Sequence, residues 1–371
     1  MTRAPCYVFV GAFRDRASDG SIGGQIAACN SLVASPISDR VQWIAIDSTT
    51  LSADDPALST RALRAARRLG TFARRIGRAD GALLFSSARF SFVEKGVMAL
   101  VAKGLGKRVV VCPRSGLLLD DLERSRFMRW FIPFVMQRCD VVVCQGQSWK
   151  TLFAGLDIPV ERLAVIPNWL DTGPYARLAA RRAPRETRTF VYMGRIETYK
   201  GIFDLIDAVD RQRDALERAR FVICGGGSAE AEARRRVTRL GLADRFEFRG
   251  WVAGEAKNHV WREADVLVLP SHREGMPNAV LEAMAAGLAV IAARVGGVPD
   301  ILTSDQHGVL VAPGDVAALG EALADLARDR DRCRELGRAA RDHVASSHDI
   351  DRIWPRMLAA LDPASTSHSE P

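Results

Sequence analysis

The sequence predicts an α/β protein with two domains, each built around a doubly wound parallel sheet. Short apolar runs rich in Val and Ile, such as "CYVFVGAF" and "RVVVCP", alternate with longer amphipathic runs such as "RALRAARRLGTFARRI". This alternation is typical of βαβ units. The strand-like runs are apolar along almost their whole length, which indicates a sheet covered by helices on both faces. The pattern stops once and begins again, so the chain of 371 residues is predicted to form two such domains.

The interruption lies at residues 173–187, which are rich in Pro, Gly and Arg and are interpreted as an interdomain linker. We therefore predict an N-terminal domain over residues 1–172 and a C-terminal domain over residues 173–348. Residues 364–371 are polar, and we expect a disordered tail there.

Composition excludes several classes of protein. No run of 18 apolar residues is present, so no helix is expected to span a membrane. The N-terminus lacks the apolar core of a signal peptide. The seven cysteines form no C-x-x-C pair, and their odd number argues against a disulfide framework. We expect a cytoplasmic protein whose cysteines are small buried residues rather than metal ligands or a redox centre.

The positive charge belongs to the first half of the chain. Residues 1–172 contain 23 Lys or Arg and 15 Asp or Glu, whereas residues 173–371 contain 29 of each. The basic run at residues 61–76 and the aromatic run "RFMRWFIPFVMQR" at residues 126–138 both lie in this half, and they favour peripheral association with an anionic membrane. Two alternatives stay open. The charge excess could consist of solvated arginines without an anionic partner, and the aromatic run could be a buried helix. No nucleic-acid partner is expected, because no recognised module accompanies the charge.

The stretch "YMGRIETYKGI" is predicted to bind a diphosphate. A strand ends at Gly194, the following loop presents Arg195 and Lys200, and a helix begins near Gly201. Two cations at the carboxyl end of a strand, beside the amino end of a helix, are suited to phosphate groups. The alternative is a solvated basic loop.

Two glycine-rich turns are less specific. Gly23 and Gly24 open the first helix just after the first strand, where the backbone can approach a ligand closely; a flexible loop is the alternative. The turn in "FVICGGGSAEAEARRRV" is followed by no Gly-Lys-Ser/Thr and lacks the G-x-G-x-x-G spacing, so it is interpreted as a structural turn.

Glu274 and Glu282 in "REGMPNAVLEAMAAG" are separated by eight positions. Pro277 suits the first turn of a helix and Gly287 suits its end, so Glu274 precedes the helix and Glu282 lies inside it. With a rise of about 1.5 Å per residue, we expect the two carboxylates to lie about 10 Å apart. A glycosidase pair needs about 5–9.5 Å. The spacing favours one carboxylate at each end of an elongated ligand such as a nucleoside-diphosphate sugar. The alternative is a salt-bridged surface glutamate, which fits Glu282 less well because the residues around it are apolar.

With "GRIETYKG" and "REGMPNAVLEAMAAGLAVIAARVGGVPDIL", in which two glutamates flank seven residues, the sequence resembles the retaining glycosyltransferases of family 4. This is the glycogen-synthase-like group 1 with the GT-B fold. The resemblance is strong over residues 187–345 and weaker over residues 1–172. It implies two Rossmann-like domains facing a central cleft, with a helix at residues 349–363 crossing back to the N-terminal domain.

The resemblance also implies an activity. A sugar would pass from a nucleotide-diphosphate-sugar donor to a glycan or lipid-linked acceptor in bacterial cell-surface polysaccharide or glycolipid synthesis. The transfer would need no metal and no cofactor. The N-terminal domain would bind the acceptor, and the C-terminal domain would bind the donor.

The resemblance assigns roles to individual residues. Arg195 and Lys200 would bind the donor diphosphate, Glu274 would touch the donor sugar, and Glu282 would bind the ribose. The first three are the candidate catalytic residues. The remaining donor-side positions are Gly23, Gly24, Gly194, Gly250, Trp251, Val252, Gly275, Met276, Pro277, Asn278, Ala279 and Val280. No metal ligand is expected.

One departure concerns the N-terminal domain. Many members carry a histidine after the strand that matches "VVVCP", but all six histidines here lie at residue 259 or later. Arg114 and Ser115 occupy that neighbourhood, and a charged guanidinium can only donate hydrogen bonds. Asp120 and Asp121 are further acceptor-side candidates. The departure leaves two other functions open: a catalytically silent nucleotide-sugar-binding regulatory subunit, and a nucleotide-sugar epimerase of similar fold.

Overall fold

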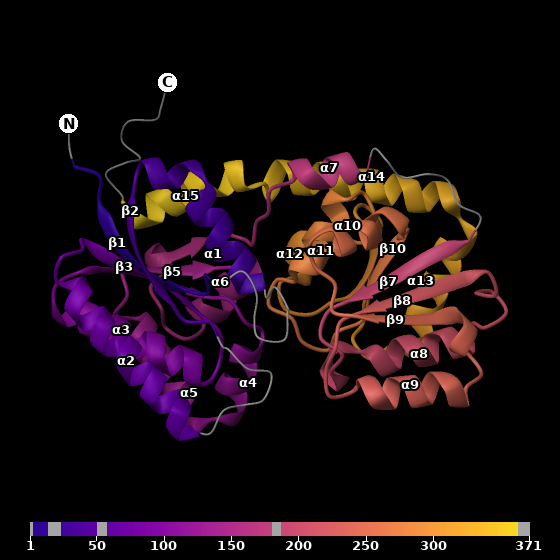
Figure 1. Cartoon of the computed structure of the whole chain (residues 1–371), viewed down its shortest axis with the longest axis horizontal. Coiled ribbons are helices and arrows are strands. Elements are labelled where there is room, and N and C mark those ends of the chain that lie inside the picture. Colours follow the sequence, from indigo (N-terminus) through magenta and orange to yellow (C-terminus); the bar gives the residue numbers. More distant parts are fainter. Residues whose placement is uncertain (1–2, 14–23, 50–57, 180–186, 363–371) are drawn as a thin grey trace. The chain divides into compact units, whose positions relative to one another are not determined.

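The chain consists of two compact units, each with a six-stranded parallel sheet between layers of helices (Figure 1). The computed structural model describes residues 3–13, 24–49, 58–179 and 187–362. Unit 1 comprises the described parts of residues 1–170 and 350–371, and unit 2 those of residues 171–349. The predicted fold class, two doubly wound α/β domains, is confirmed.

The sheet of unit 1 is parallel throughout. Its strands, in sheet order, are β2 (Gln42–Asp47), β1 (Cys6–Gly11), β3 (Gly81–Ser86), β4 (Arg108–Pro113), β5 (Val141–Cys144) and β6 (Leu163–Val165). Successive residues of β1 enter different cores: Val8 and Val10 join one core, and Tyr7 and Phe9 join the other. This is why the apolar runs are nearly continuous in the sequence, since side chains on both faces of the strand are buried.

The helices of unit 1 cover both faces of this sheet. They are α1 (Gly24–Ala34), α2 (Leu58–Ile76), α3 (Phe90–Gly104), α4 (Leu117–Arg124), α5 (Arg126–Met136), α6 (Gln147–Ala154) and α15 (Ile350–Leu361), with 3-10 turns η1 (Pro36–Asp39) and η2 (Val160–Arg162). Helices α2, α3 and α5 line one face, and α1 and α15 line the other (Figure 1). On α15, Ile353 and Met357 are fully buried against this sheet, so the C-terminal helix returns to the N-terminal unit as expected.

Unit 2 repeats the architecture. Its strands, in sheet order, are β12 (Val309–Val311), β11 (Ala289–Ala293), β10 (Val266–Leu269), β7 (Arg188–Met193), β8 (Ala219–Cys224) and β9 (Phe246–Gly250), all parallel. Its helices are α7 (Gly173–Ala179), α8 (Ile202–Arg211), α9 (Glu230–Arg239), α10 (Gly254–Glu263), α11 (Asn278–Ala285), α12 (Val298–Ile301), α13 (Val316–Arg328) and α14 (Arg330–Ser347), with 3-10 turns η3 (Thr198–Lys200) and η4 (Ala243–Arg245).

The segment predicted as a linker begins with a helix instead. Residues 173–179 form α7, which packs against α10 and α11 inside unit 2. Asp171 Oδ1 accepts a hydrogen bond from Gly173 N at 3.0 Å, and Leu178 is buried. Proline suits the first turn of a helix, so the Gly-Pro pair that indicated a loop in the sequence starts a helix here. Residues 180–186 lie outside the described residues, as do Gly23 and the tail at residues 364–371.

The composition led to two predictions, one on membrane-spanning helices and one on the cysteines, and both can be compared with the described residues. None of the described helices is long and apolar enough to cross a bilayer. All seven cysteines are buried with free thiols, and burial raises the pKa of Cys29 to about 12. The cysteines are therefore small core residues, as predicted.

Candidate functional site

The candidate donor site lies where the strands of unit 2 end. Because these strands are parallel, their carboxyl ends meet at one edge of the sheet. The loops that follow β7, β10 and β11 are joined there through their backbones. His272 N donates to Tyr199 O at 2.8 Å, and Gly297 N donates to Gly275 O at 2.6 Å. Segments 73 and 22 positions apart in the sequence thus form one surface.

An ion pair joins the two predicted catalytic motifs. Lys200 Nζ lies 2.7 Å from Glu274 Oε1, and both side chains are largely buried, at 18% and 8% exposed. Ser271 Oγ donates to the same carboxylate oxygen at 2.8 Å. The sequence predicted Lys200 and Glu274 as separate contacts to phosphate and sugar, and the structure places them in direct contact.

Two glycines allow these loops to approach each other. Gly201 has φ +71°, and a Cβ at that position would lie 2.0 Å from Pro270 O. Gly296 has φ +54°, and a Cβ there would lie 2.0 Å from Glu274 O. Any other residue would push these loops apart. The glycines of the two sequence motifs therefore fix the position of the carboxylate.

Arg195 is presented on the surface of the loop after β7. Its side chain is 64% exposed, and its Nη2 lies 3.4 Å from Glu197 Oε1. The Glu197 carboxylate also accepts hydrogen bonds from Ser228 Oγ at 2.5 Å and Ser228 N at 3.3 Å. Desolvation alone would raise the pKa of Glu197, but these bonds and the Arg195 charge lower it below the ordinary value. Tyr192 Oη donates to Arg195 O at 2.7 Å and fixes the backbone beneath the guanidinium.

Glu282 lies within α11, as predicted from Pro277 and Gly287. The helix begins after Pro277, and Gly287 lies two residues beyond its end with φ +73°. Glu282 Oε2 lies 2.5 Å from Lys257 Nζ of α10, with 13% of the glutamate side chain exposed. Burial, together with the Glu282 charge, raises the pKa of Tyr175 on α7. Glu282 therefore forms the salt bridge that the sequence left open as an alternative, with a partner, Lys257, that the sequence did not predict.

The turn after β8 packs against the end of β9. Gly225 N donates to Gly250 O at 2.7 Å, and a Cβ at Gly225 would lie 1.8 Å from Gly194 O. Trp251 is 41% exposed, and its Nε1 would lie 3.0 Å from a Cβ on Gly226. The glycine turn is structural, as predicted, and it brings Gly194 and Gly250 to the same edge of the sheet.

The other donor-side candidates differ in burial. Gly275, Met276, Pro277 and Val280 are buried, whereas Val252, Asn278 and Ala279 are partly exposed. The exposed positions include the start of α11, where backbone N–H groups and the helix dipole favour an anion. In unit 1, Gly24 is the first residue of α1.

The acceptor-side candidates lie at the carboxyl edge of the unit 1 sheet. The Arg114 guanidinium lies over the rings of Phe85 and Trp169, 4.9 and 4.6 Å from their centroids. Its Nη2 donates to Asn168 Oδ1 at 2.6 Å, while its Nη1 is buried without a hydrogen-bond partner among the described residues.

The neighbours of Arg114 have local structural contacts. Ser115 Oγ accepts from Leu117 N at 3.3 Å. Asp121 is buried and accepts from Arg89 N at 2.5 Å, while Asp120 lies in the first turn of α4. Asp121 therefore holds the start of α3, a role that the sequence did not predict.

Sequence reasoning missed Ser271, Ser228, Glu197 and Lys257. Ser228, Glu197 and Lys257 act through contacts with segments 25 or more positions away, for which no local pattern exists, whereas Ser271 contacts Glu274 only three positions along the chain. Only Ser271 had a signal, because a small polar residue directly after a buried strand faces the same edge as the motif that follows. In the part of the chain that the structure describes, no three His, Cys, Asp or Glu side chains come together as metal ligands would.

Two Rossmann-like units, with a final helix that returns from the second to the first, define the GT-B fold. Solved structures of this fold match over almost the whole chain. Anabaena HepE in complex with UDP superposes with a TM-score of 0.73 and 17% identity, covering 99% of this chain and 100% of that one. Sucrose-phosphate synthase from Thermosynechococcus elongatus gives a TM-score of 0.76 and 18% identity, covering 98% and 100%.

Residues 178–343 match the family described as glycosyl transferases group 1. A GDP-mannose-dependent alpha-(1-6)-phosphatidylinositol monomannoside mannosyltransferase of Mycobacterium tuberculosis is 32% identical over 236 residues, 60% of this chain and 61% of that protein. A D-inositol 3-phosphate glycosyltransferase of Corynebacterium diphtheriae is 35% identical over 169 residues, 44% and 40% of the two chains. Each match spans less than two thirds of the relative's own length.

Proposed function

We propose that the protein is a retaining, metal-independent hexosyltransferase that moves a sugar from a nucleoside-diphosphate sugar to a glycan or lipid-linked acceptor. The observation that carries the proposal is the Lys200–Glu274 pair at the carboxyl edge of a doubly wound sheet, with Arg195 in the same loop as Lys200. Ligands of open α/β sheets bind at this edge. The match of residues 178–343 to the family described as glycosyl transferases group 1 supports the reaction class.

The reaction develops negative charge on the departing nucleoside diphosphate. Arg195 and Lys200 would stabilise that charge, and stabilisation of developing charge is commonly the largest single contribution to catalysis. The bond between the anomeric carbon and the diphosphate oxygen breaks while the acceptor hydroxyl attacks the same face of the sugar. The proton of that hydroxyl passes to the departing phosphate oxygen. In this proposal, Arg195 and Lys200 supply the positive charge that a bound metal ion would supply in a metal-dependent transferase.

Glu274 and Glu282 would hold the two ends of the donor. Glu274 is fixed by Lys200 and Ser271, so its second oxygen can accept a hydrogen bond from a sugar hydroxyl. Glu282, held by Lys257, would accept from the ribose diol. Trp251, which is 41% exposed beside the turn after β8, would pack against the base.

The relatives suggest the kind of acceptor. The mycobacterial relative is named for a phosphatidylinositol monomannoside, and the corynebacterial relative for inositol 3-phosphate. Both acceptors carry a phosphate, and the first is a lipid. We therefore propose a phosphorylated or lipid-linked acceptor, used in the synthesis of a bacterial surface polysaccharide or glycolipid.

A face of α5 supports a lipid-linked acceptor. Phe127 and Trp130 are 52% and 58% exposed, and Trp130 stacks on Phe134 with centroids 4.9 Å apart. We call these three residues the aromatic face of α5. The exposed arginines at positions 126, 129 and 138 surround this face. Aromatic side chains flanked by arginines suit the interface of an anionic bilayer, and we propose that this face docks on the cytoplasmic leaflet.

A screen of sugar nucleotides with the full chain tests the proposed activity. Thermal unfolding is measured with UDP-, GDP- and ADP-sugars, and a ligand at about 100 times its dissociation constant should add about 2.7 kcal/mol of stability. The stabilising donor is then incubated without acceptor, and slow release of free sugar is expected. Interconversion of the donor sugar would indicate an epimerase, and tight binding without hydrolysis or transfer would indicate a silent subunit. No stabilisation by any sugar nucleotide would contradict the proposal.

A further inference from the structure

A second side-chain pair joins the same two segments as the Lys200–Glu274 pair. His272 Nε2 lies 2.7 Å from Asp204 Oδ2. An ionised carboxylate can only accept hydrogen bonds, so the ring Nε2 donates this one. Asp204 lies in the first turn of α8, four residues after Lys200, and His272 lies two residues before Glu274. Along the α8 segment, the two pairs therefore flank Gly201, where the backbones approach each other.

His272 is held by this segment at two points. Its backbone N donates to Tyr199 O at 2.8 Å, and its ring pairs with Asp204. The side chains of Asp204 and His272 are 21% and 40% exposed, so the pair contributes little to the stability of the fold. Its effect is local, on the position of the loop after β10 that carries Glu274.

Binding of a donor would affect the two pairs differently. In the proposed reaction Lys200 contacts the diphosphate and Glu274 contacts the donor sugar, so both groups are drawn toward the donor and their contact with each other weakens. Asp204 and His272 take no part in the proposed donor contacts and can stay paired throughout the reaction. The Asp204–His272 pair would then keep the two segments in register while Lys200 and Glu274 act on the donor.

We propose that Asp204 and His272 are positioning residues that hold Lys200 and Glu274 in the geometry required for sugar transfer. This inference rests on the proposed function of the donor site. A displacement of about 1 Å in a catalytic group can cost about 100-fold in rate, so a pair with little effect on stability can have a large effect on turnover. Binding of the nucleoside diphosphate keeps both of its cations, Arg195 and Lys200, and should change little.

Steady-state hydrolysis of a sugar nucleotide by the full chain tests this inference. The probe is whichever of UDP-glucose, GDP-mannose and ADP-glucose the wild type hydrolyses fastest, and the corresponding nucleoside diphosphate is titrated by calorimetry. Asp204→Ala and His272→Leu should each lower kcat about 10-fold or more, and should change the dissociation constant of the nucleoside diphosphate less than about 3-fold. His272→Gln should keep kcat within about 3-fold of the wild type, because the glutamine amide nitrogen can donate to Asp204 in place of Nε2.

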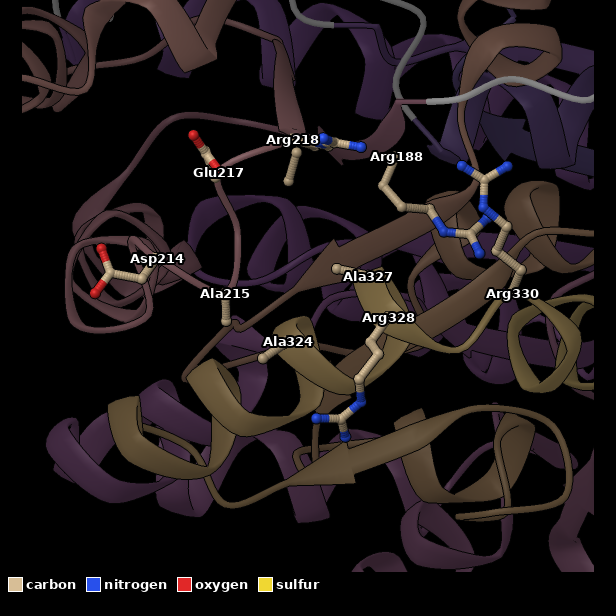
Figure 2. A pocket seen from close by; sticks show the side chains of 10 residues that line it. Arg188, Asp214, Ala215, Glu217, Arg218, Ala324, Ala327, Arg328 and Arg330 are labelled. Carbon is tan, nitrogen blue, oxygen red and sulfur yellow. The ribbon is translucent and has the colours of Figure 1, made fainter.

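Two control variants remove other ion pairs of unit 2. Asp207, three residues after Asp204 on α8, pairs with Arg236 of α9 at 2.6 Å. Arg328 lines a cavity beside the start of β7, at the edge of the sheet opposite to the donor site, and pairs with Asp325 at 2.6 Å (Figure 2). Asp207→Ala and Arg328→Gln should keep kcat within about 2-fold of the wild type, and the midpoint of thermal unfolding should hardly change in any of these variants.

Hydrogen exchange of the His272 amide tests the pair without any substrate. The bond to Tyr199 O protects this amide, so loosening of the two segments should speed its exchange about 10-fold in Asp204→Ala and leave it unchanged in Asp207→Ala. Lower kcat with unchanged nucleotide affinity and faster exchange supports the inference. Normal kcat in Asp204→Ala, or equal losses of kcat in Asp204→Ala and Asp207→Ala, overturns it.

Failure of the proposed function would be recognised separately. If the wild type hydrolyses none of the three sugar nucleotides, the proposed function is contradicted and the exchange measurement decides the role of the pair alone. Faster exchange in Asp204→Ala then supports the Asp204–His272 pair as the contact that holds the loop before Glu274, and unchanged exchange overturns it.

Discussion

Lys200 Nζ lies 2.7 Å from Glu274 Oε1, although the two residues are 74 positions apart in the chain. Each lies between a different strand of the unit 2 sheet and the helix that follows that strand, and the close approach at Gly201 holds the two segments together. The cation proposed for the diphosphate and the carboxylate proposed for the sugar are thus positioned by each other before any donor binds. Catalytic groups that are held in place before the substrate binds stabilise the transition state most, because they need no reorganisation during the reaction.

Glu274→Gln should separate sugar recognition from nucleotide binding. Glutamine keeps an acceptor for Ser271 and a similar shape, but it removes the negative charge. We expect transfer or donor hydrolysis to fall about 100-fold, in line with the loss of one preorganised catalytic contact. The dissociation constant for the nucleoside diphosphate should stay within about 3-fold, because Arg195 and Lys200 remain. Titration with the nucleoside diphosphate and steady-state rates measure the two effects. Unchanged turnover would exclude Glu274 from the reaction.

Arg195→Gln should weaken binding of the nucleoside diphosphate without affecting the fold. The side chain is 64% exposed and contacts only a short loop, so the midpoint of thermal unfolding should hardly change. The lost charge-assisted contact corresponds to about a 10-fold or greater increase in the dissociation constant. Arg235→Gln is the matched control, since Arg235 is 68% exposed and also pairs with a glutamate, Glu232. Equal affinities of the two variants would rule out a phosphate contact by Arg195.

The sequence predicted those parts of the site that rest on local rules. Pro277 and Gly287 mark the ends of α11 because proline suits a first helical turn and glycine suits the left-handed residue after the last turn. The prediction of a linker was wrong for residues 173–179. Gly and Pro are common in loops but also occur at the starts of helices, and the packing of this segment against α10 and α11 is a tertiary contact that the local sequence does not record. The partners of the predicted residues, such as Lys257 of Glu282, depend on tertiary contacts that no local pattern records.

Gly201→Ala should cost more stability than Gly241→Ala. The two glycines have nearly equal φ angles, +71° and +68°, so an alanine is strained at both. A Cβ at Gly241 meets nothing within 4 Å, whereas one at Gly201 would lie 2.0 Å from Pro270 O. We expect Gly241→Ala to lower the free energy of unfolding by about 1 kcal/mol and Gly201→Ala by clearly more. Urea unfolding measures both. Nucleotide affinity should fall in Gly201→Ala alone. Equal losses of stability and equal nucleotide affinities in the two variants would contradict a structural role for the close approach of Gly201 to Pro270.

Acid should destabilise the fold through a histidine pair. The rings of His307 and His343 stack with centroids 4.2 Å apart. Desolvation lowers the pKa of both from 6.5, and at His343 the neighbouring His307 adds to this effect. Because the unfolded chain binds these protons more readily, stability is complete above about pH 6.5 and falls as the pH drops below it. Each histidine contributes a slope of at most about 1.4 kcal/mol per pH unit.

His307→Phe tests this pair because it keeps a ring to stack on His343 and cannot be protonated. The free energy of unfolding, measured from pH 7.5 to pH 5, should fall less steeply in this variant than in the wild type. Glu197, whose pKa is lowered, titrates below this range and does not obscure the comparison. Identical slopes in the two proteins would show that the pair does not govern acid stability.

Trp130→Ser should reduce binding to anionic vesicles and leave the fold intact. Trp130 is 58% exposed at the centre of the aromatic face of α5, so its loss removes apolar area from the bilayer contact rather than from the core. Co-sedimentation with phosphatidylglycerol-containing vesicles should show about a 10-fold or greater loss of partitioning. Leu105→Ser is the matched control, because Leu105 is 54% exposed but lies outside this face. Binding should also weaken as salt is raised, since the surrounding arginines act through charge. Vesicle binding that both variants reduce equally, or that neither reduces, would refute the docking of α5 on a membrane.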